Sequence, residues 1–449
     1  MLFAAIGFLI GGLDDLAIDG VFLAVWARRR LRRVDAGDGM IADYPIKAAP
    51  RRFAVFVPAW DEAPVIGAML RTTLARYGIA DYRLYVGTYP NDRVTIDAVA
   101  AVAELDARVR LVIGERDGPS TKADCLNTLW RALKRDEAAG GWQAAAIVQH
   151  DAEDVVHPHE LQVYDALLDR YSVVQLPVLP LIDRRARLVS GHYADEFAEA
   201  HAKNLLVRQA LGAGIPLAGV GCAIERNVLE TVSQASDGKP FDASSITEDY
   251  ELGLTLSRLG ADSVIARVRE RAGGPLVAVR AYFPSTFATS VRQKARWMTG
   301  IALAGWDRIG WAPAHDLAEH WMRMRDRRAP FAVLILAVAY VALVVWAGSA
   351  VAHGFAATPR PRISGATALL LDINAGLLVW RMMMRVAFTT RDYGWVEGLW
   401  SLPRALVGNF IALIAVRRAV WHYVRSLRGA ALHWDKTAHV FPENPALEA

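Results

Sequence analysis

The chain has 449 residues, of which 53% are hydrophobic and 22% charged, and so much apolar surface excludes a disordered protein. The 51 basic and 47 acidic residues exclude a purely membrane-embedded bundle, while a net charge of +4 is too small to indicate nucleic-acid binding. Two cysteines cannot build a disulfide framework, and we expect a protein with one water-soluble part and one membrane part.

Residues 1–27 are apolar except for three aspartates, Asp14, Asp15 and Asp19. A signal peptide would show a basic start and a cleavage site of small residues, and neither is clear, so this stretch is predicted to be an N-terminal membrane anchor. The basic cluster at 28–33 is predicted to stay in the cytoplasm. The aspartates either line a polar path or pair with Arg381, or they break the helix near the membrane interface.

Between residues 50 and 300, β-branched runs alternate with helical segments, which predicts an α/β fold with a doubly wound, mostly parallel sheet. In such sheets ligands bind beyond the carboxyl ends of the strands. Four successive predicted strands end in polar segments, and four together favour a binding crevice over ordinary loops. The predicted strands are Phe53–Val57, Tyr82–Thr88, Val109–Ile113, Ala145–Gln149 and Val173–Leu176, and the predicted helices include Val65–Arg76, Thr95–Leu105 and Lys122–Lys134.

Three carboxylates, Asp151, Glu153 and Asp154, directly follow the fourth predicted strand. Clustered carboxylates suit a hard divalent cation such as Mg²⁺ or Mn²⁺, which commonly bridges a diphosphate. The alternative is a solvated acidic turn that caps the next helix. Lys122, at the start of a predicted helix, either meets a phosphate or is simply solvated.

A second group of carboxylates lies at 245–251, at the start of another predicted helix. In a catalytic interpretation Asp249, beside Glu248, is a general base that takes a proton from an acceptor hydroxyl. In a structural interpretation the acidic residues only stabilise the helix N-terminus, with Thr247 or Ser244 as the N-cap.

A later predicted helix carries Gln293, Arg296 and Trp297 on one face. A guanidinium and an amide can hold phosphate oxygens, and an indole can stack on a sugar ring. The alternative is a basic amphipathic helix at the membrane surface, and residues 301–328 are predicted to form further interfacial helices.

Residues 329–425 are predicted to hold the C-terminal transmembrane and interfacial segments. The stretch 329–352 has no charge and is long enough to span a bilayer. A second candidate span covers 363–386. A third apolar segment, 405–416, is short and is expected to lie in the interface or to enter the membrane only partly.

The second candidate span contains Asp372 and Arg381, and this arginine is a candidate partner for the N-terminal aspartates. The basic cluster at 323–328 precedes the first span and is predicted to be cytoplasmic, like the cluster at 28–33. Everything between the two clusters is then cytosolic, and residues 426–449 are predicted to be a cytosolic tail.

These segments, in this order, resemble the family-2 inverting glycosyltransferases of the processive, membrane-embedded type. The resemblance covers roughly residues 50–300 and implies a GT-A-like nucleotide-sugar domain flanked by transmembrane and interfacial helices. This sequence has Glu153 where many synthases have the second aspartate of an Asp-x-Asp motif. The residues that carry the resemblance are Pro58, Glu62, Asp92, Lys122, Asp151, Glu153, Thr247, Glu248, Asp249, Gln293, Arg296 and Trp297.

The resemblance also implies a role for each matching position. The nucleotide would be held by Pro58, Trp60, Glu62, Asp92, Lys122 and Asp151. A Mg²⁺ or Mn²⁺ ion would be held by Asp151, Glu153 and Asp154. Catalysis would fall to Asp249, with Glu248 beside it, while Gln293 and Arg296 would contact the diphosphate and Trp297 the acceptor sugar.

A closer resemblance, at 12–19, 150–158, 409–419 and 434–442, is to the bacteriophage adsorption protein B group of inner-membrane glycosyltransferases. It implies a multi-pass protein of the bacterial inner membrane with a cytosolic catalytic domain. The expected reaction is transfer of a sugar, an N-acetylhexosamine, from a UDP-sugar to a growing exopolysaccharide with inversion, together with help in export. The expected partners are the UDP-sugar, a polysaccharide acceptor, membrane lipid, an outer-membrane export partner and a cyclic di-GMP-binding regulatory subunit.

Two alternatives belong to other classes of function. One is an enzyme that moves a single sugar onto a lipid carrier. The other is a receptor or scaffold whose transferase domain is inactive, although the acidic residues and the Gln-x-x-Arg-Trp residues are all present, which argues against decay.

Overall fold

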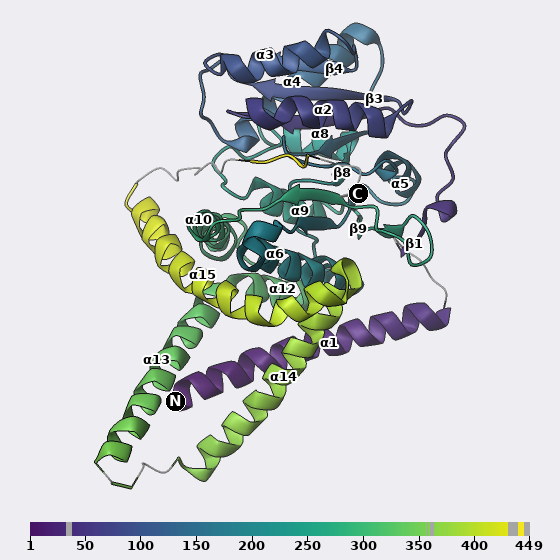
Figure 1. Ribbon diagram of the computed structural model, residues 1–449. Helices are drawn as coiled ribbons and strands as arrows, with labels where there is room; N and C mark the ends of the chain where they lie inside the picture. Colours follow the sequence, from purple (N-terminus) through teal and green to yellow (C-terminus); the bar gives the residue numbers. More distant parts are fainter. Residues whose placement is uncertain (33–37, 357, 360–362, 430–438, 444–449) are drawn as a thin grey trace.

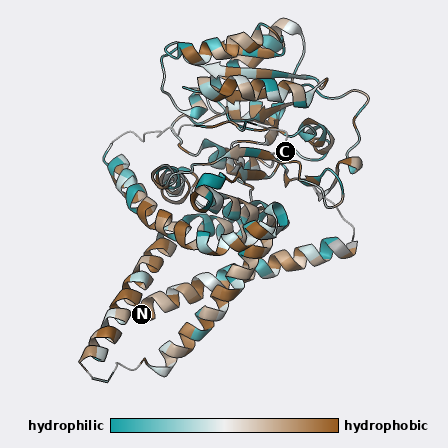
Figure 2. Cartoon of the chain, viewed as in Figure 1, coloured by the Kyte–Doolittle hydropathy of each residue, from teal (hydrophilic) through white to brown (hydrophobic). Residues whose placement is uncertain are grey.

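The structure is a computed structural model that describes residues 1–32, 38–356, 358–359, 363–429 and 439–443. An α/β domain lies above a hairpin of two long helices, and two further long helices cross between them (Figure 1). The apolar residues concentrate in the long helices below the domain (Figure 2), as expected for a protein with a water-soluble part and a membrane part.

The α/β domain is built on a seven-stranded sheet with the order β4-β3-β2-β5-β8-β6-β9. Every neighbouring pair is parallel except the two made by β8, which runs antiparallel to β5 and β6. The prediction of a mostly parallel sheet is therefore confirmed. The strands are β2 (Phe53–Pro58), β3 (Tyr82–Thr88), β4 (Val109–Ile113), β5 (Ala146–Gln149), β6 (Val173–Gln175), β8 (Cys222–Glu225) and β9 (Ser263–Ile265).

Two further sheets each consist of two parallel strands. In one, β1 pairs with β10, and in the other β7 pairs with β11. Because each pair joins strands far apart in the sequence, these sheets tie distant parts of the chain together. Their bounds are β1 (Asp38–Met40), β10 (Arg267–Arg269), β7 (Val178–Leu181) and β11 (Val279–Tyr282).

Strand β2 shows why helices cover both faces of the large sheet. Phe53, Val55 and Val57 belong to one buried core cluster, while Ala54 and Phe56 belong to another. Successive side chains of a strand point to opposite faces, so a strand that is apolar throughout needs cover on both sides. Burial of one large apolar side chain stabilises the folded state by about 1.5–3 kcal/mol. One cluster includes residues of α2 (Ala63–Tyr77), α3 (Arg93–Ala103) and α5 (Glu160–Leu167), and the other includes residues of α4 (Lys122–Gly140), α8 (Arg226–Gln234) and α9 (Glu248–Arg258).

A layer of shorter helices lies between the sheet and the long helices (Figure 1). The predicted interfacial helices at 301–328 correspond to the last three of them. Two short 3-10 turns, η1 (Ile41–Asp43) and η2 (Arg184–Ala186), lie elsewhere in the chain. The layer consists of α6 (Arg187–Glu199), the π-helical η3 (Ala200–Asn204), α7 (Leu205–Ala210), α10 (Phe287–Trp297), the π-helical η4 (Met298–Ala304), α11 (Gly305–Arg308) and α12 (Leu317–Arg327).

Three helices are long and apolar enough to cross a membrane, namely α13 (Ala329–Phe355), α14 (Gly365–Tyr393) and α15 (Trp395–Leu427). The protein is therefore a membrane protein. The expected length of the third apolar segment was wrong, because α15 has 33 residues and continues through Pro403. The helix extends beyond its apolar part because Arg404 pairs with Asp195 of α6 at 3.1 Å, and α15 curves beneath the α/β domain (Figure 1).

Helix α1 (Leu2–Arg32) is unbroken, so the interpretation of its aspartates as a helix break is wrong. Asp14 and Asp15 instead form ion pairs with Arg325 and Arg328, at the end of α12. The ion pairs offset the charges of the two aspartates within the helix. The same contacts show that these two arginines serve as partners of α1.

Asp19 also has a buried cationic partner. Lys203 Nζ lies 2.5 Å from a carboxylate oxygen of Asp19 and 2.5 Å from one of Glu199. Arg381 pairs with Glu199, and its Nε lies 4.0 Å from Asp15, which confirms the expected pairing for that aspartate. A membrane-anchor role for α1 and a polar path through the membrane stay predictions.

Candidate active site

The carboxyl ends of β2, β3 and β5 meet at one edge of the sheet, because these neighbouring strands are parallel. Pro58 is the last residue of β2, and Trp60 and Glu62 follow it. Asp92 caps the helix after β3, and Asp151 comes two residues after β5. The structure thus brings predicted nucleotide-binding residues from three segments to one edge.

Asp92 orders the loop that follows β2. Its Oδ2 accepts a 2.5 Å hydrogen bond from the amide of Asp61, and its Oδ1 accepts one from the amide of Thr95. The Thr95 hydroxyl in turn accepts a 3.0 Å hydrogen bond from the amide of Glu62. Trp60 packs edge-to-face against the tyrosine that follows β3, with ring centroids 5.1 Å apart. The loop is therefore held in place before any ligand binds.

The ammonium of Lys122, the first residue of α4, lies among three carboxylates. It is 2.6 Å from Oδ1 of Asp151 and donates a 3.2 Å hydrogen bond to the carbonyl of Gly219. Burial alone would lower the pKa of Lys122, but the charges of Asp151, Glu248 and Asp249 outweigh burial and raise this pKa. Lys122 is therefore cationic at neutral pH and suited to contact a phosphate.

Glu248 and Asp249 lie in the first turn of α9. Burial raises the pKa of Glu248 to about 7, with the charge of Asp249 adding to the rise and Lys122 opposing it. Burial also raises the pKa of Asp249, against the lowering effects of Lys122 and Arg296. A carboxylate with a raised pKa is a better proton acceptor, as a general base requires.

Helix capping alone does not explain the start of α9. Thr247 is the N-cap residue, but its side chain makes no capping hydrogen bond, and its Oγ1 has no hydrogen-bond partner among the residues described. The π-helical η4 packs closely against it, because a Cβ added to Gly300 would lie 2.4 Å from that oxygen. This packing brings the carboxylates of α9 next to the segment that carries Arg296.

Two polar atoms of the predicted phosphate-binding face of α10 are buried. Neither Gln293 Oε1 nor Arg296 Nε has a hydrogen-bond partner within the described part of the chain. A buried polar atom left unsatisfied costs about 1–3 kcal/mol, so both atoms favour a bound ligand. Trp297, the third residue of the motif, lies in an aromatic cluster, with ring centroids 5.9 Å from Tyr193 and 6.3 Å from Phe283.

The acidic turn after β5 is supported by a buried histidine. His150 Nδ1 lies 3.0 Å from Asp154, and Nε2 lies 2.7 Å from Glu160. Burial would lower the pKa of His150, but the two carboxylates raise it to about 10. Asp154 Oδ2 also accepts a hydrogen bond from the amide of Asp151. Asp154 therefore shapes the turn, and its role as a metal ligand stays a prediction.

Glu153 faces Glu62 and His439, and not the histidine that supports the acidic turn. One ligand atom each from Glu62, Glu153 and His439 lies within 4.8 Å of the others, an arrangement that can hold a metal ion. Burial raises the pKa of Glu153 to about 8, with His439 opposing the rise. The pKa of His439 is raised to about 9 because its carboxylate neighbours outweigh burial. His439 is a site residue that the motifs of the sequence did not identify.

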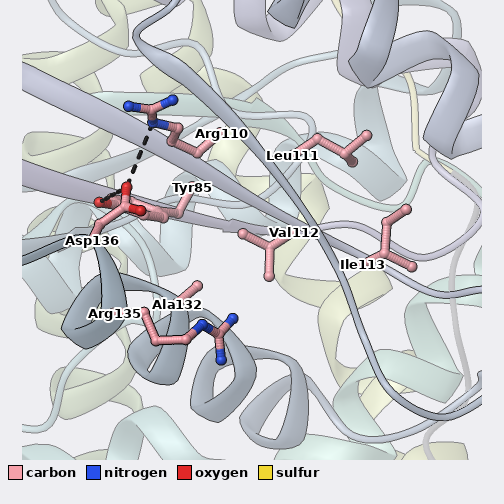
Figure 3. A pocket seen from close by; sticks show the side chains of 8 residues that line it. All are labelled: Tyr85, Arg110, Leu111, Val112, Ile113, Ala132, Arg135 and Asp136. Carbon is pink, nitrogen blue, oxygen red and sulfur yellow. Dashed lines mark hydrogen bonds and ion pairs between the residues drawn. The ribbon is translucent and has the colours of Figure 1, made fainter. Parts of the chain in front are cut away.

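A surface cavity of about 250 Å³ lies away from these residues, at the β4 edge of the sheet. Figure 3 shows it between Arg110 and Val112 of β4 and Arg135 and Asp136 of α4. None of the predicted site residues lines this cavity. The strand-end residues, and not this cavity, are the candidate active site.

The domain is GT-A-like and mostly parallel, and it combines a lysine suited to contact a phosphate with buried carboxylates. Together with the long apolar helices, these features are typical of nucleotide-sugar transferases. The chain belongs to the glycosyltransferase-like family 2, whose family profile matches residues 50–300.

Over 98% of its length the chain is 34% identical to bacteriophage adsorption protein B of Escherichia coli strain K12. The identity and coverage are the same for bacteriophage N4 adsorption protein B of Escherichia coli O157:H7. The chain spans 61% of the length of each of these relatives.

Among solved structures, the mannosyltransferase PcManGT from Pyrobaculum calidifontis, in complex with GDP-Man and Mn²⁺, is similar with a TM-score of 0.54. The two chains are 18% identical, and the match covers 94% of this chain and 99% of the mannosyltransferase. At this identity the similarity supports the fold of the chain and not its substrate.

Proposed function

We propose that the protein is a multi-pass glycosyltransferase of the bacterial inner membrane, with its catalytic domain in the cytosol. It transfers a sugar from a UDP-sugar to a growing exopolysaccharide with inversion at the anomeric carbon. The observation that carries the proposal is the convergence of Lys122 and Arg296 on the buried Asp249, because both cations lower the pKa of this carboxyl while Lys122 also lies 2.6 Å from Asp151. Two cations beside a buried base suit a reaction that expels a diphosphate.

In this mechanism Asp249 accepts the proton of the acceptor hydroxyl. The hydroxyl oxygen forms a bond to the anomeric carbon while the bond from that carbon to the diphosphate oxygen breaks, and its electron pair leaves with the diphosphate. A single displacement inverts the anomeric centre. The burial that raises the pKa of Asp249 makes this proton transfer more favourable.

The charge on the departing diphosphate is matched by groups of this chain. Lys122 and Arg296 supply positive charge, and Gln293 supplies an amide. A Mg²⁺ or Mn²⁺ ion fits Glu62, Glu153 and His439, because one ligand atom of each lies within 4.8 Å of the others and two of the three are carboxylates. When bound, such an ion neutralises negative charge on the diphosphate.

The donor is proposed to lie against Trp60 and Asp92, which frame the end of β2. Its identity as a UDP-linked N-acetylhexosamine is supported by the resemblance of the motifs. The mannosyltransferase of similar fold was solved with GDP-Man, so the test must include guanosine donors.

The acceptor is proposed to lie over Trp297, because aromatic rings bind the apolar faces of sugars. Trp297 lies on α10, which packs against α15, so the acceptor end of the site adjoins the long helices. This position supports a polymer that leaves toward the membrane. A single transfer to a lipid carrier remains the second candidate, because it too needs an acceptor at the membrane.

The experiment uses membranes that contain the protein and a panel of radiolabelled UDP- and GDP-sugars, each with Mg²⁺ or Mn²⁺. The proposal predicts incorporation from one UDP-sugar into a product of high molecular mass. A labelled lipid of low molecular mass would favour the single transfer, and no product with any donor would contradict the proposal. An export partner and a cyclic di-GMP-binding subunit stay predictions.

A further inference from the structure

The C-terminal segment 439–443 lies against the donor end of the site. His439 Nδ1 is 2.8 Å from Oε1 of Glu62, a residue 377 positions earlier in the chain, and 3.3 Å from Oε2 of Glu153. Phe441 packs against the core cluster that includes α2, and Pro442 is buried. The contacts of Phe441 and Pro442 anchor the segment independently of the histidine.

The separations of these atoms match those around a small divalent cation. An ion about 2.0–2.1 Å from two ligands at right angles holds those ligands about 3.0 Å apart. The two measured separations from His439 Nδ1, 2.8 and 3.3 Å, lie on either side of that value. The carboxylates of Glu62 and Glu153 are also buried, with exposed fractions of 5% and 9%. The three side chains are thus already arranged as ligands.

An independent observation also favours a cation. Oε2 of Glu153 is buried, and among the described residues its contact is the 3.3 Å ion pair with His439, without a hydrogen bond; a buried carboxylate oxygen with so little compensation is costly. The cationic lysine of the site, Lys122, is paired with Asp151. An ion that contacts Glu153 would satisfy this oxygen.

We infer that His439 is a ligand of a divalent cation held together with Glu62 and Glu153, so that the ion fastens the C-terminal segment over the donor site. This inference deepens the proposed function, on which it rests for the nucleotide. Mg²⁺ prefers oxygen ligands, whereas transition-metal ions also bind imidazole nitrogen. Between the two ions of the proposed function, the imidazole therefore favours Mn²⁺ over Mg²⁺.

The rival explanation is that a protonated His439 only neutralises the two carboxylates. The two explanations predict opposite effects when the histidine is removed. If His439 is a metal ligand, its removal weakens metal binding. If His439 is only a counter-ion, its removal frees Glu62 and Glu153 and leaves metal binding unchanged or tighter.

The test is titration of the full purified chain with Mn²⁺ alone, with free Mn²⁺ followed by electron paramagnetic resonance. His439→Ala is expected to raise the Kd for Mn²⁺ at least about tenfold, since loss of a group that supports a metal ligand already costs 10–100-fold. The competing affinity for Mg²⁺ is expected to change less. Val440→Ala, at an exposed position of the same segment, is the matched control and is expected to bind Mn²⁺ like the wild type.

A second variant, His439→Glu, separates the explanations further, because a carboxylate ligates metal but cannot neutralise Glu62 and Glu153. It is expected to retain Mn²⁺ binding and to bind Mg²⁺ more tightly. Unchanged or tighter Mn²⁺ binding by His439→Ala would overturn the inference, as would loss of Mn²⁺ binding in His439→Glu. The Mn²⁺ titration contains no sugar nucleotide, so its result does not depend on the donor. Absence of transfer in the donor panel would therefore contradict the proposed function but not the role of His439 as a metal ligand.

Discussion

A β-carbon at Gly219 would lie 2.5 Å from Oδ2 of Asp249, so the candidate base has its place only because residue 219 has no side chain. Gly219 also has a φ of 75°, which other residues rarely adopt, and its carbonyl accepts a hydrogen bond from Lys122. A single glycine thus sets the positions of both the base and the phosphate-suited lysine.

Gly219→Ala is expected to lower kcat by about 100-fold, because displacement of a catalytic group by about 1 Å has an effect of that size. Gly212→Ala is the matched control, since Gly212 also has a φ of 75° but has no atom within 4 Å of the added carbon. The control carries the backbone strain without the clash. Equal kcat values for the two variants would contradict the role of Gly219.

Activity is expected to be lost on the acid side at a pH above the usual pKa of an aspartate. Burial raises the pKa of Asp249, and a base works only when deprotonated, so activity falls as the pH drops through this raised pKa. Lys122 lowers the same pKa, and Lys122→Met is therefore expected to move the acid limb of kcat to higher pH. Lys122→Arg keeps the charge and should leave the limb near its wild-type position. A limb that does not move in Lys122→Met would count against Asp249 as the base.

Local patterns predicted most of the α/β domain, since apolar runs such as Phe53–Val57 and polar strand ends are visible within a few residues. The sequence left the continuity of α1 open, because it offered Arg381 as a partner of the aspartates but not Arg325 and Arg328, which lie more than 300 positions from Asp14 and Asp15. The length of α15 was missed for the same reason, since Arg404 depends on Asp195 of α6. Charge pairs over long sequence distances leave no periodic signal.

The site shows the same division. Lys122, Asp151 and Asp249, which the motifs predicted as site residues, lie close together in the structure, because each follows a strand or begins a helix. They did not identify His439, although it lies in one of the stretches that resemble the adsorption protein B group. They also did not distinguish Glu153, which faces the possible ligands, from Asp154, which is held by His150.

That distinction predicts different effects for two neighbouring substitutions. Glu153→Gln is expected to raise the Mn²⁺ concentration needed for half-maximal transfer at least about tenfold. Asp154→Asn is expected to lower the Tm of the purified protein, because it leaves the buried His150 with one carboxylate fewer. EDTA is expected to abolish transfer by the wild type. A Tm loss confined to Glu153→Gln would reverse the two assignments.

The buried ion pairs that Lys203 of η3 makes with Asp19 of α1 and Glu199 of α6 predict a large effect on stability. Lys203→Met would leave Asp19 and Glu199 buried without their shared cation, and we expect a loss of about 3–5 kcal/mol. The measurement is thermal or denaturant unfolding of the purified protein in detergent. Arg93→Met, in the exposed pair with Asp97, is the control and is expected to change stability by less than about 1 kcal/mol. Equal stability of the two variants would contradict a structural role for Lys203.

The role of Asp249 as the base of a sugar transfer can be tested by comparing Asp249→Asn with the wild type in two measurements. One is transfer from the UDP-sugar that the donor panel identifies, and the other is binding of UDP to the purified protein. Loss of a positioned base costs about 10²–10⁴-fold in rate. We predict that Asp249→Asn loses transfer in that range while UDP binding stays nearly unchanged. Transfer by Asp249→Asn at the wild-type rate would contradict the role of Asp249 as the base.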